Sequence, residues 1–215
     1  MAEKATLHFD GKDFDFPVLT GSESEKAFDI SELRKKTGLV TLDYGYLNTG
    51  STKSNITFVD GEQGILRYRG YAIEDLAEKA TFPETAWLLI YGELPTEEQL
   101  THFRKMLTEN ALIHENLLHF FREMPPSAHP MGILSSIVNA VGLFTPRFYD
   151  DEDKEDVFNL TTAGLISKIR TIAAFTYKAS IGEPFVYPEA ERSYCSNFLN
   201  MMFSSKTKPY NPDPI

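Results

Sequence analysis

The amino-acid sequence predicts a mainly α-helical, multi-helical protein in which a small β-rich segment precedes about eight helices. Short alternating runs and turn signals dominate residues 1–71, whereas capping boxes and helical periodicity dominate from residue 72 onward. Strands and helices do not alternate along the chain, which excludes doubly wound and barrel α/β folds. We therefore expect an N-terminal β-rich segment at 1–71 and a helical domain at 72–215.

The β-rich segment is expected to contain a hairpin and two further short strands. Ala5–Leu19 alternates apolar and polar residues around Asp10-Gly11, a dipeptide that favours a tight hairpin turn. Thr57–Val59 and Ile65–Tyr68 have the same strand character. Between these two regions, Asp29–Lys36 is predicted to form a short helix, with Asp29 at its N-terminus and Glu32 three residues later.

Two capping boxes mark the starts of helices in the second part, where Thr81 is followed by Glu84 and Thr96 by Gln99. One helix, Met131–Phe144, is apolar nearly all round and is therefore expected to be buried in a core. An acidic loop is expected over Asp150–Asp156 and an extended connector over Lys206–Ile215. The predicted helices are Ile73–Ala80, Glu84–Tyr91, a helix from Thr96 to about Glu109, Glu115–Glu123, Met131–Phe144, Val157–Lys178 and Ser193–Phe203.

Charge and composition exclude several classes of function. The chain of 215 residues has 21 Lys and Arg against 31 Asp and Glu, a net charge of −10 that argues against binding nucleic acid or an anionic membrane. Its single cysteine, Cys195, excludes an intrachain disulfide and a cysteine-based zinc site. No apolar run reaches the length of a membrane span, and no signal peptide opens the sequence. These features predict a cytoplasmic protein.

The residues alone assign no catalytic, cofactor-binding or metal-ligating side chain. His114 and His119 are five positions apart, which places them about 140° apart on a helix and not on one zinc-binding face. His129 is interpreted as a partner for backbone groups and Cys195 as a small packed residue. No glycine-rich phosphate loop occurs, and the acidic run lacks the glycine and terminal glutamate of a calcium loop.

Five stretches in the expected order resemble citrate synthases, specifically the bacterial type with an N-terminal β segment. Together they extend over most of the chain. They are Ile56–Tyr71, Leu89–Thr96, His129–Met131, Ser180–Pro188 and Asn197–Phe203. The resemblance implies a mostly helical fold with a large and a small domain, of which 72–215 is an incomplete large domain.

The resemblance also implies an acyltransferase of the tricarboxylic acid cycle. The family condenses oxaloacetate with acetyl-CoA to give citrate and free CoA, and it needs no metal or redox cofactor. In the family an aspartate removes a proton from the acetyl methyl group, one histidine stabilises the enol and a second assists at the ketone. The active assembly implied is a homo-oligomer, either a dimer or a hexamer, whose small-molecule partners are the two substrates.

The chain departs from the family at the residues that carry this chemistry. The family's His-Ala-Asp-His-Glu segment and its catalytic residues would follow the last residue of this sequence, and none of the five histidines matches them. The expectation is therefore an N-terminal portion that is inactive alone, with no catalytic residue assigned. Two alternatives stay open: a portion of a 2-methylcitrate synthase, and a non-catalytic helical interaction protein derived from the same fold.

A regulatory difference is also expected. Some relatives bind NADH through basic and aromatic side chains, whereas this sequence has Glu109–Leu112, Thr145 and Gly164 at those positions. Among the positions that are basic in those relatives, only Lys168 keeps a positive charge here, and it is interpreted as the remnant of an allosteric site. Since a dinucleotide needs cationic donors for its phosphates, the complete enzyme is expected to be insensitive to NADH.

Overall fold

The computed structural model describes residues 3–144 and 154–212, with the backbone alone at 154–156. The chain divides into two compact units, 1–55 and 56–215. Strands between residues 57 and 72 contact the first helix of the second unit. These strands therefore belong to the second unit, and the domain boundary expected after residue 71 stays a prediction.

The first unit is built on a three-stranded antiparallel sheet in which the predicted hairpin is confirmed. Strand β1 (Lys4–Phe9) pairs with β2 (Lys12–Thr20), and β2 pairs with β3 (Lys26–Phe28). Asp10 and Gly11 connect the hairpin with φ of 50° and 70°, the left-handed conformations that a two-residue type I′ turn requires.

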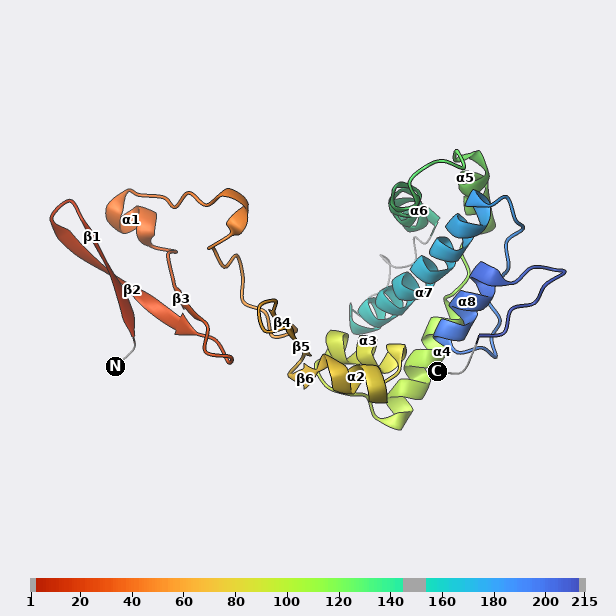
Figure 1. Cartoon of the computed structure of the whole chain (residues 1–215), viewed down its shortest axis with the longest axis horizontal. Coiled ribbons are helices and arrows are strands. Elements are labelled where there is room, and N and C mark those ends of the chain that lie inside the picture. The colour runs from red at the N-terminus through yellow and green to blue at the C-terminus, as the bar shows by residue number, and fades with distance from the viewer. Residues whose placement is uncertain (1–2, 145–153, 213–215) are drawn as a thin grey trace. The chain divides into compact units, whose positions relative to one another are not determined.

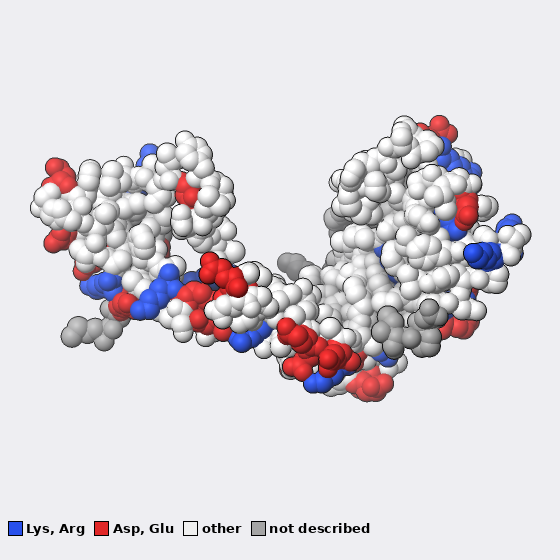
Figure 2. All heavy atoms as spheres, viewed as in Figure 1, with Lys and Arg blue, Asp and Glu red and all other residues white. Residues whose placement is uncertain are grey.

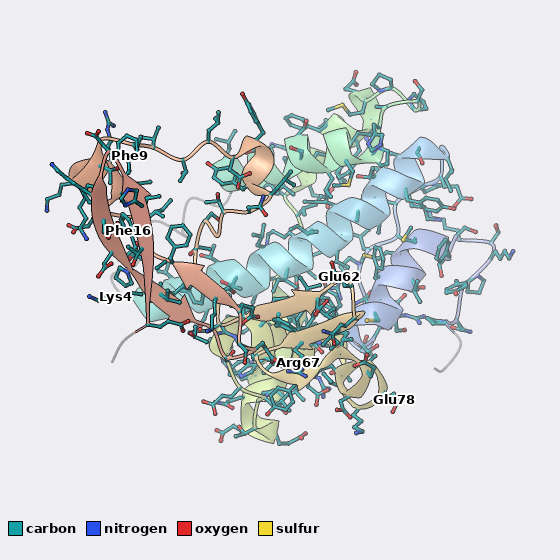
Figure 3. The ribbon with its side chains drawn as sticks, turned by 60° about the vertical axis from the view of Figure 1, so that its left-hand side comes forward. Lys4, Phe9, Phe16, Glu62, Arg67 and Glu78 are labelled. Atoms are coloured by element: carbon teal, nitrogen blue, oxygen red, sulfur yellow. The ribbon has the colours of Figure 1, made fainter. Side chains whose placement is uncertain are left out.

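A small apolar core lies beside this hairpin (Figure 3). Phe16 of β2 is buried, its ring lies 6.4 Å from that of Phe28, and the ammonium of Lys36 lies 5.2 Å from its centroid. Helix α1 (Leu33–Thr37) adds the buried Leu33. The helix is shorter than expected: Asp29 accepts a hydrogen bond from Ser31 N (2.8 Å), residues 31 and 32 form a turn, and the α-helix begins at Leu33.

The segment after α1 is held by a single carboxylate. Asp43 accepts hydrogen bonds from Leu47 N (3.1 Å), Asn48 N (2.9 Å) and Thr49 Oγ1 (2.6 Å). The bond from Thr49, followed by that from Asn48, holds the pKa of this carboxyl below its usual range. A short 3-10 helix, η1 (Tyr44–Tyr46), lies inside the turn. Large apolar side chains on this segment are nevertheless exposed: Val40, Leu42, Tyr44, Tyr46 and Leu47.

The second unit opens with a small antiparallel sheet that leads directly into helices. Strand β4 (Thr57–Asp60) pairs with β5 (Ile65–Tyr68), and β5 pairs with β6 (Tyr71–Ala72). Both strands predicted here are thus confirmed, and β6 passes without a loop into α2 (Ile73–Lys79).

The helices that follow agree with the sequence in number and order, with differences at their ends. The predicted helix at 115–123 divides into a 3-10 turn and a short α-helix, and the last long helix begins at Lys154, inside the expected acidic loop. Residues 150–153 of that loop lie outside the described residues. The elements are α3 (Phe82–Tyr91), α4 (Glu97–Glu109), η2 (Glu115–Leu117), α5 (Leu118–Glu123), α6 (Pro130–Phe144), α7 (Lys154–Ser180) and α8 (Tyr194–Phe203).

Helix α7 is the centre of the second unit and contacts α4, α5, α6 and α8 (Figure 1). Its C-terminal half joins a core built with α5, α6 and α8, in which Phe175, Ile172 and Ile137 are buried. Its N-terminal half joins a second cluster with α3 and α4, around Phe103 and Leu107. One long helix therefore ties together α3, α4, α5, α6 and α8.

Helix α6 corrects one expectation. Its apolar sequence predicts burial on all sides, but only the face with Ile133, Ile137 and Val141 is buried against the core. Met131 and Leu143 are 60% and 82% exposed. Helix α7 and η2 contact α6, and in the described residues this packing leaves Met131 and Leu143 exposed. Within the described residues, no helix combines the length and hydropathy that crossing a bilayer requires.

Both predicted capping boxes are present. Thr96 N donates to Gln99 Oε1 (2.8 Å) while Thr96 Oγ1 accepts from Gln99 N (3.3 Å) at the start of α4. At the start of α3, the Thr81 hydroxyl and backbone N–H both donate to Glu84 Oε2. These bonds, the hydroxyl first, hold the pKa of the Glu84 carboxyl below its usual value of 4.5.

Replacing Glu84 with Gln is expected to reduce the acid sensitivity of the second unit. Because its pKa is lower in the folded chain than in the unfolded one, Glu84 stabilises the fold above pH 4.5 and loses this contribution as the pH falls through its folded-state pKa. The contribution is about 0.5–1 kcal/mol, the size of a helix cap. Urea unfolding near neutral pH and at about pH 3 measures it. Glu78→Gln, an exposed change on α2 (Figure 3), is the control and should leave the acid sensitivity unaltered.

Candidate functional site

The histidines do not form a catalytic group in the described residues. His114 Nδ1 accepts from Asn116 N (3.1 Å), and its ring lies 4.7 Å from that of Phe144. His129 Nδ1 accepts from Met131 N (3.2 Å), which confirms the backbone role expected for it. Across the described residues, no three His, Cys, Asp or Glu side chains come together as a set that could hold a metal ion. The expectation that Cys195 is packed is wrong, because its side chain is exposed at the start of α8.

Polar side chains on one face of α7 instead complete the end of α4. Ser167 Oγ donates to Leu107 O (2.5 Å), Lys168 Nζ to Asn110 O (2.9 Å) and Thr171 Oγ1 to Ala111 O (2.7 Å). A helix leaves its last carbonyls without intrahelical donors, and buried carbonyls need a partner. The spacing of these three residues places their side chains on one side of α7, where they act as a cap supplied by a different helix.

This capping face is where the predicted allosteric residue lies. Lys168 is 7% exposed, and burial lowers the pKa of its ammonium. Of the neighbouring positions, Glu109 is 3.8 Å from Lys105 in an exposed ion pair, and Thr145 lies outside the described residues. The structure thus gives Lys168 a carbonyl partner within its own unit, and its assignment to an effector site stays a prediction.

A second basic side chain of α7 is stacked on one ring. Arg170 lies 4.3 Å over the ring of Tyr194 and donates through Nη1 to Tyr194 O (3.0 Å). On the next layer Phe82 stacks on Tyr194 with centroids 4.5 Å apart. Desolvation is the main influence on Arg170 and lowers its pKa, while Tyr194 acts in the opposite direction. This cation–π stack joins the starts of α3 and α8 to the middle of α7.

A third basic residue of α7, Lys178, lies in the last turn of that helix. Lys178 is 1% exposed, and its ammonium donates to Ser204 O (2.7 Å) and to the carboxylate of Glu183. Ser204 is the C-cap of α8. The Lys178 ammonium therefore caps the end of α8 and also holds Glu183 in the loop that follows α7. Gly182 turns the chain there with φ of 69°.

A hollow of about 640 Å³ lies beside this turn, where α5, the end of α7 and the chain after α8 meet. Its wall is mostly apolar and includes three aromatic residues, of which the Phe121 and Phe185 rings lie 5.6 Å apart at 62°. Phe185 in turn stacks on the buried Phe175 at 4.6 Å. The lining includes Phe121, Arg122, Glu183, Phe185, Tyr187 and Lys206.

Two cations and a fixed tyrosine set the electrostatics of the hollow. Tyr187 donates its hydroxyl to Glu115 (3.0 Å to Oε1), and burial, then this bond, raises the pKa of the phenol. Arg122 and Lys206 line the hollow, and within the described residues neither has a carboxylate at ion-pair distance. Glu183 also lines it, but Lys178 neutralises that carboxylate. The lining of the hollow thus has two cations, and the Glu115 carboxylate is bonded to its Tyr187, whereas other carboxylates gather over α2 (Figure 2).

Sequence reasoning did not identify this hollow as a site. One available signal was Ser180–Pro188, which resembles the family and supplies Glu183, Phe185 and Tyr187. The two cations come from elements far apart in the chain, so their pairing around one cavity had no sequence signal.

Comparison with known proteins relates the chain to one family. A model described as the C-terminal domain of citrate synthase matches residues 45–215. Citrate synthase 1 of Mycobacterium tuberculosis, from strains CDC 1551 and H37Rv alike, is 43% identical over 212 residues. The match covers 99% of this chain and 49% of the relative, so the chain spans about half the length of the curated relatives it matches.

Solved structures agree with the sequence comparison. Citrate synthase from Pyrobaculum aerophilum matches 93% of this chain and 46% of its own, with a TM-score of 0.65 and 26% identity. The enzyme from Thermotoga maritima matches 76% and 42%, with a TM-score of 0.64 and 29% identity. A ternary complex of citrate synthase from Thermoplasma acidophilum with carboxymethyl coenzyme A and oxaloacetate matches 73% of this chain and 40% of its own. Its TM-score is 0.65 and its sequence identity is 26%. By its sequence and its mainly helical fold, the chain belongs to the citrate synthase family.

Proposed function

We propose that this chain supplies the N-terminal portion of a cytoplasmic citrate synthase, an acyltransferase that condenses oxaloacetate with acetyl-CoA in the tricarboxylic acid cycle. The observation that carries the proposal is the 43% identity that extends over 99% of the chain and half of the relative. The related complex with oxaloacetate and carboxymethyl coenzyme A supports these two substrates. The chain contributes scaffold, and the acid–base residues are expected from the other half.

The exposed apolar surface supports assembly with further polypeptide. Met131 and Leu143 of α6 and Leu165 and Ile169 of α7 are all exposed, although these helices form the centre of the unit. Apolar side chains gathered on helices in this way are typical of surfaces that another chain or segment covers. We propose that a homo-oligomer, a dimer or a hexamer, is the active form.

The isolated 215-residue chain is expected to release no CoA from acetyl-CoA and oxaloacetate. His8 and Asp13 pair at 2.6 Å on the exposed β1–β2 hairpin, but none of the five histidines matches the family's catalytic motif. A thiol-detection assay compares the purified chain with a preparation from cells that carry an empty vector. Turnover above that background would contradict the expectation and place a catalytic centre within this chain.

A chimera provides the positive test. The chain joined to the part of Mycobacterium tuberculosis citrate synthase 1 that follows the matched region is expected to release CoA with acetyl-CoA. The same chimera given propionyl-CoA tests the 2-methylcitrate synthase alternative by its relative rate. A soluble, folded chimera that fails with both thioesters would favour the non-catalytic interaction protein instead.

A further inference from the structure

Cys195 is the single cysteine of the chain, and it is exposed at the start of α8. It is the second residue of that helix, after the N-cap Ser193 and Tyr194. The N-terminus of a helix carries a partial positive charge, because its first N–H groups have no intrahelical acceptor. Reactive cysteines lie in partly exposed, electropositive surroundings, whereas buried structural cysteines are inert. The position of Cys195 therefore gives its thiol the access to solvent that a reaction needs.

Arg170 of α7 brings a full positive charge to the same helix end. Its Nη1 donates to Tyr194 O (3.0 Å), the carbonyl of the residue directly before Cys195. The guanidinium lies 4.3 Å over the Tyr194 ring, and the side chain is only 5% exposed. These two contacts with Tyr194 hold a buried cation next to the residue that carries the thiol.

The guanidinium of Arg170 has donors that are not used. Nε and Nη2 are buried, and neither has a hydrogen-bond acceptor among the described residues. A buried donor without a partner is costly, so its presence in a folded protein calls for an explanation. Burial lowers the pKa of Arg170, while Tyr194 and then Cys195 act in the opposite direction. The thiol thus lies within electrostatic reach of a buried cation whose remaining donors lack an acceptor.

We propose that Cys195 is an oxidation site, at which hydrogen peroxide converts the thiol into a sulfenate whose oxygen accepts hydrogen bonds from the unpaired N–H groups of Arg170. The thiol first releases its proton to water. The sulfur then attacks one peroxide oxygen, so that an S–O bond forms, the O–O bond breaks and hydroxide leaves. Sulfur loses the two electrons that the peroxide gains. The guanidinium stabilises both the anionic sulfur that attacks and the anionic product.

Folding is expected to accelerate this oxidation, whereas a fold without such a cation would leave the rate unchanged or protect the thiol. The 215-residue chain is exposed to hydrogen peroxide, catalase stops the reaction, and mass spectrometry after alkylation measures the remaining thiol. A dimedone adduct identifies the sulfenic acid. The folded chain should react at least about tenfold faster than N-acetylcysteine and than the same chain in urea, where Arg170 no longer lies beside Cys195. Equal or faster reaction of the unfolded chain overturns the proposal.

A pair of arginine variants tests the part played by Arg170. Arg170→Met removes the cation but keeps much of the apolar stem, and it is expected to slow the oxidation about tenfold. Arg192→Met removes the same charge from the bend before α8, where Glu189 already pairs with it (2.7 Å), and should change the rate less than about twofold.

Circular dichroism shows whether each variant is folded. Equal slowing by both variants, or no slowing by a folded Arg170→Met chain, contradicts the role of Arg170. If Arg170→Met does not fold, the comparison of the folded and urea-unfolded unmodified chain decides the proposal.

Discussion

Phe175→Ala is expected to destabilise the second unit by about 3–5 kcal/mol, the range for removing a large aromatic side chain from a core. Phe175 is 0% exposed in the C-terminal half of α7. Its ring contacts Phe121 edge to face and stacks on Phe185, so the substitution removes contacts with two other elements at once. The vacated space cannot close easily, because α5, α6 and α8 surround it. Urea unfolding followed by circular dichroism measures the free energy.

Phe158→Ala is the matched control. It makes the same chemical change in the same helix, but Phe158 is 54% exposed, so its removal should cost well under about 1 kcal/mol. Similar losses from both variants would mean that the aromatic cluster around Phe175 does not hold the unit together.

Lys178→Met is the second large effect, with an expected loss of about 2–3 kcal/mol. Methionine keeps the packing of the aliphatic stem but removes the donor to Ser204 O, which leaves a buried carbonyl at the end of α8 without its partner. The lost pairing with Glu183 contributes less, because that carboxylate is 44% exposed and water replaces the ammonium.

An exposed lysine provides the comparison for this variant. Lys79→Met removes an i,i+4 pair with Asp75 whose two side chains are exposed, and should change stability by no more than about 0.5 kcal/mol. The same urea titration serves for both variants. A loss after Lys178→Met no larger than that after Lys79→Met would show that the α8 carbonyl finds another donor.

Local signals allowed much of the fold to be predicted from the sequence. The capping boxes at Thr81 and Thr96 predicted the starts of α3 and α4, because a cap is formed by residues within one turn of each other. The start of α7 was missed because the acidic residues before Val157 have no apolar periodicity. The exposed side of α6 was also missed, because the sequence of an all-apolar helix does not show which of its sides packs against the rest of the chain.

The candidate site was less predictable, because its parts come together only in the folded chain. Lys168 was singled out as a cation, whereas its observed partner, Asn110 O, lies 58 residues away in the sequence and is a backbone atom. The same holds for Arg122 and Lys206, which line one hollow from separate elements. Backbone carbonyls look alike in every sequence, so residue type alone cannot show which of them a buried lysine will meet.

The cap that α7 provides for α4 has a consequence for the order of folding. Ser167, Lys168 and Thr171 reach carbonyls 58 to 60 residues earlier in the chain, so each bond closes a long loop whose entropy must be lost first. The last turn of α4 therefore gains its full set of bonds only after α7 has docked. Its amide protons and those of the middle of α7 are expected to exchange with solvent as one cooperative unit, even though the two segments are remote in sequence.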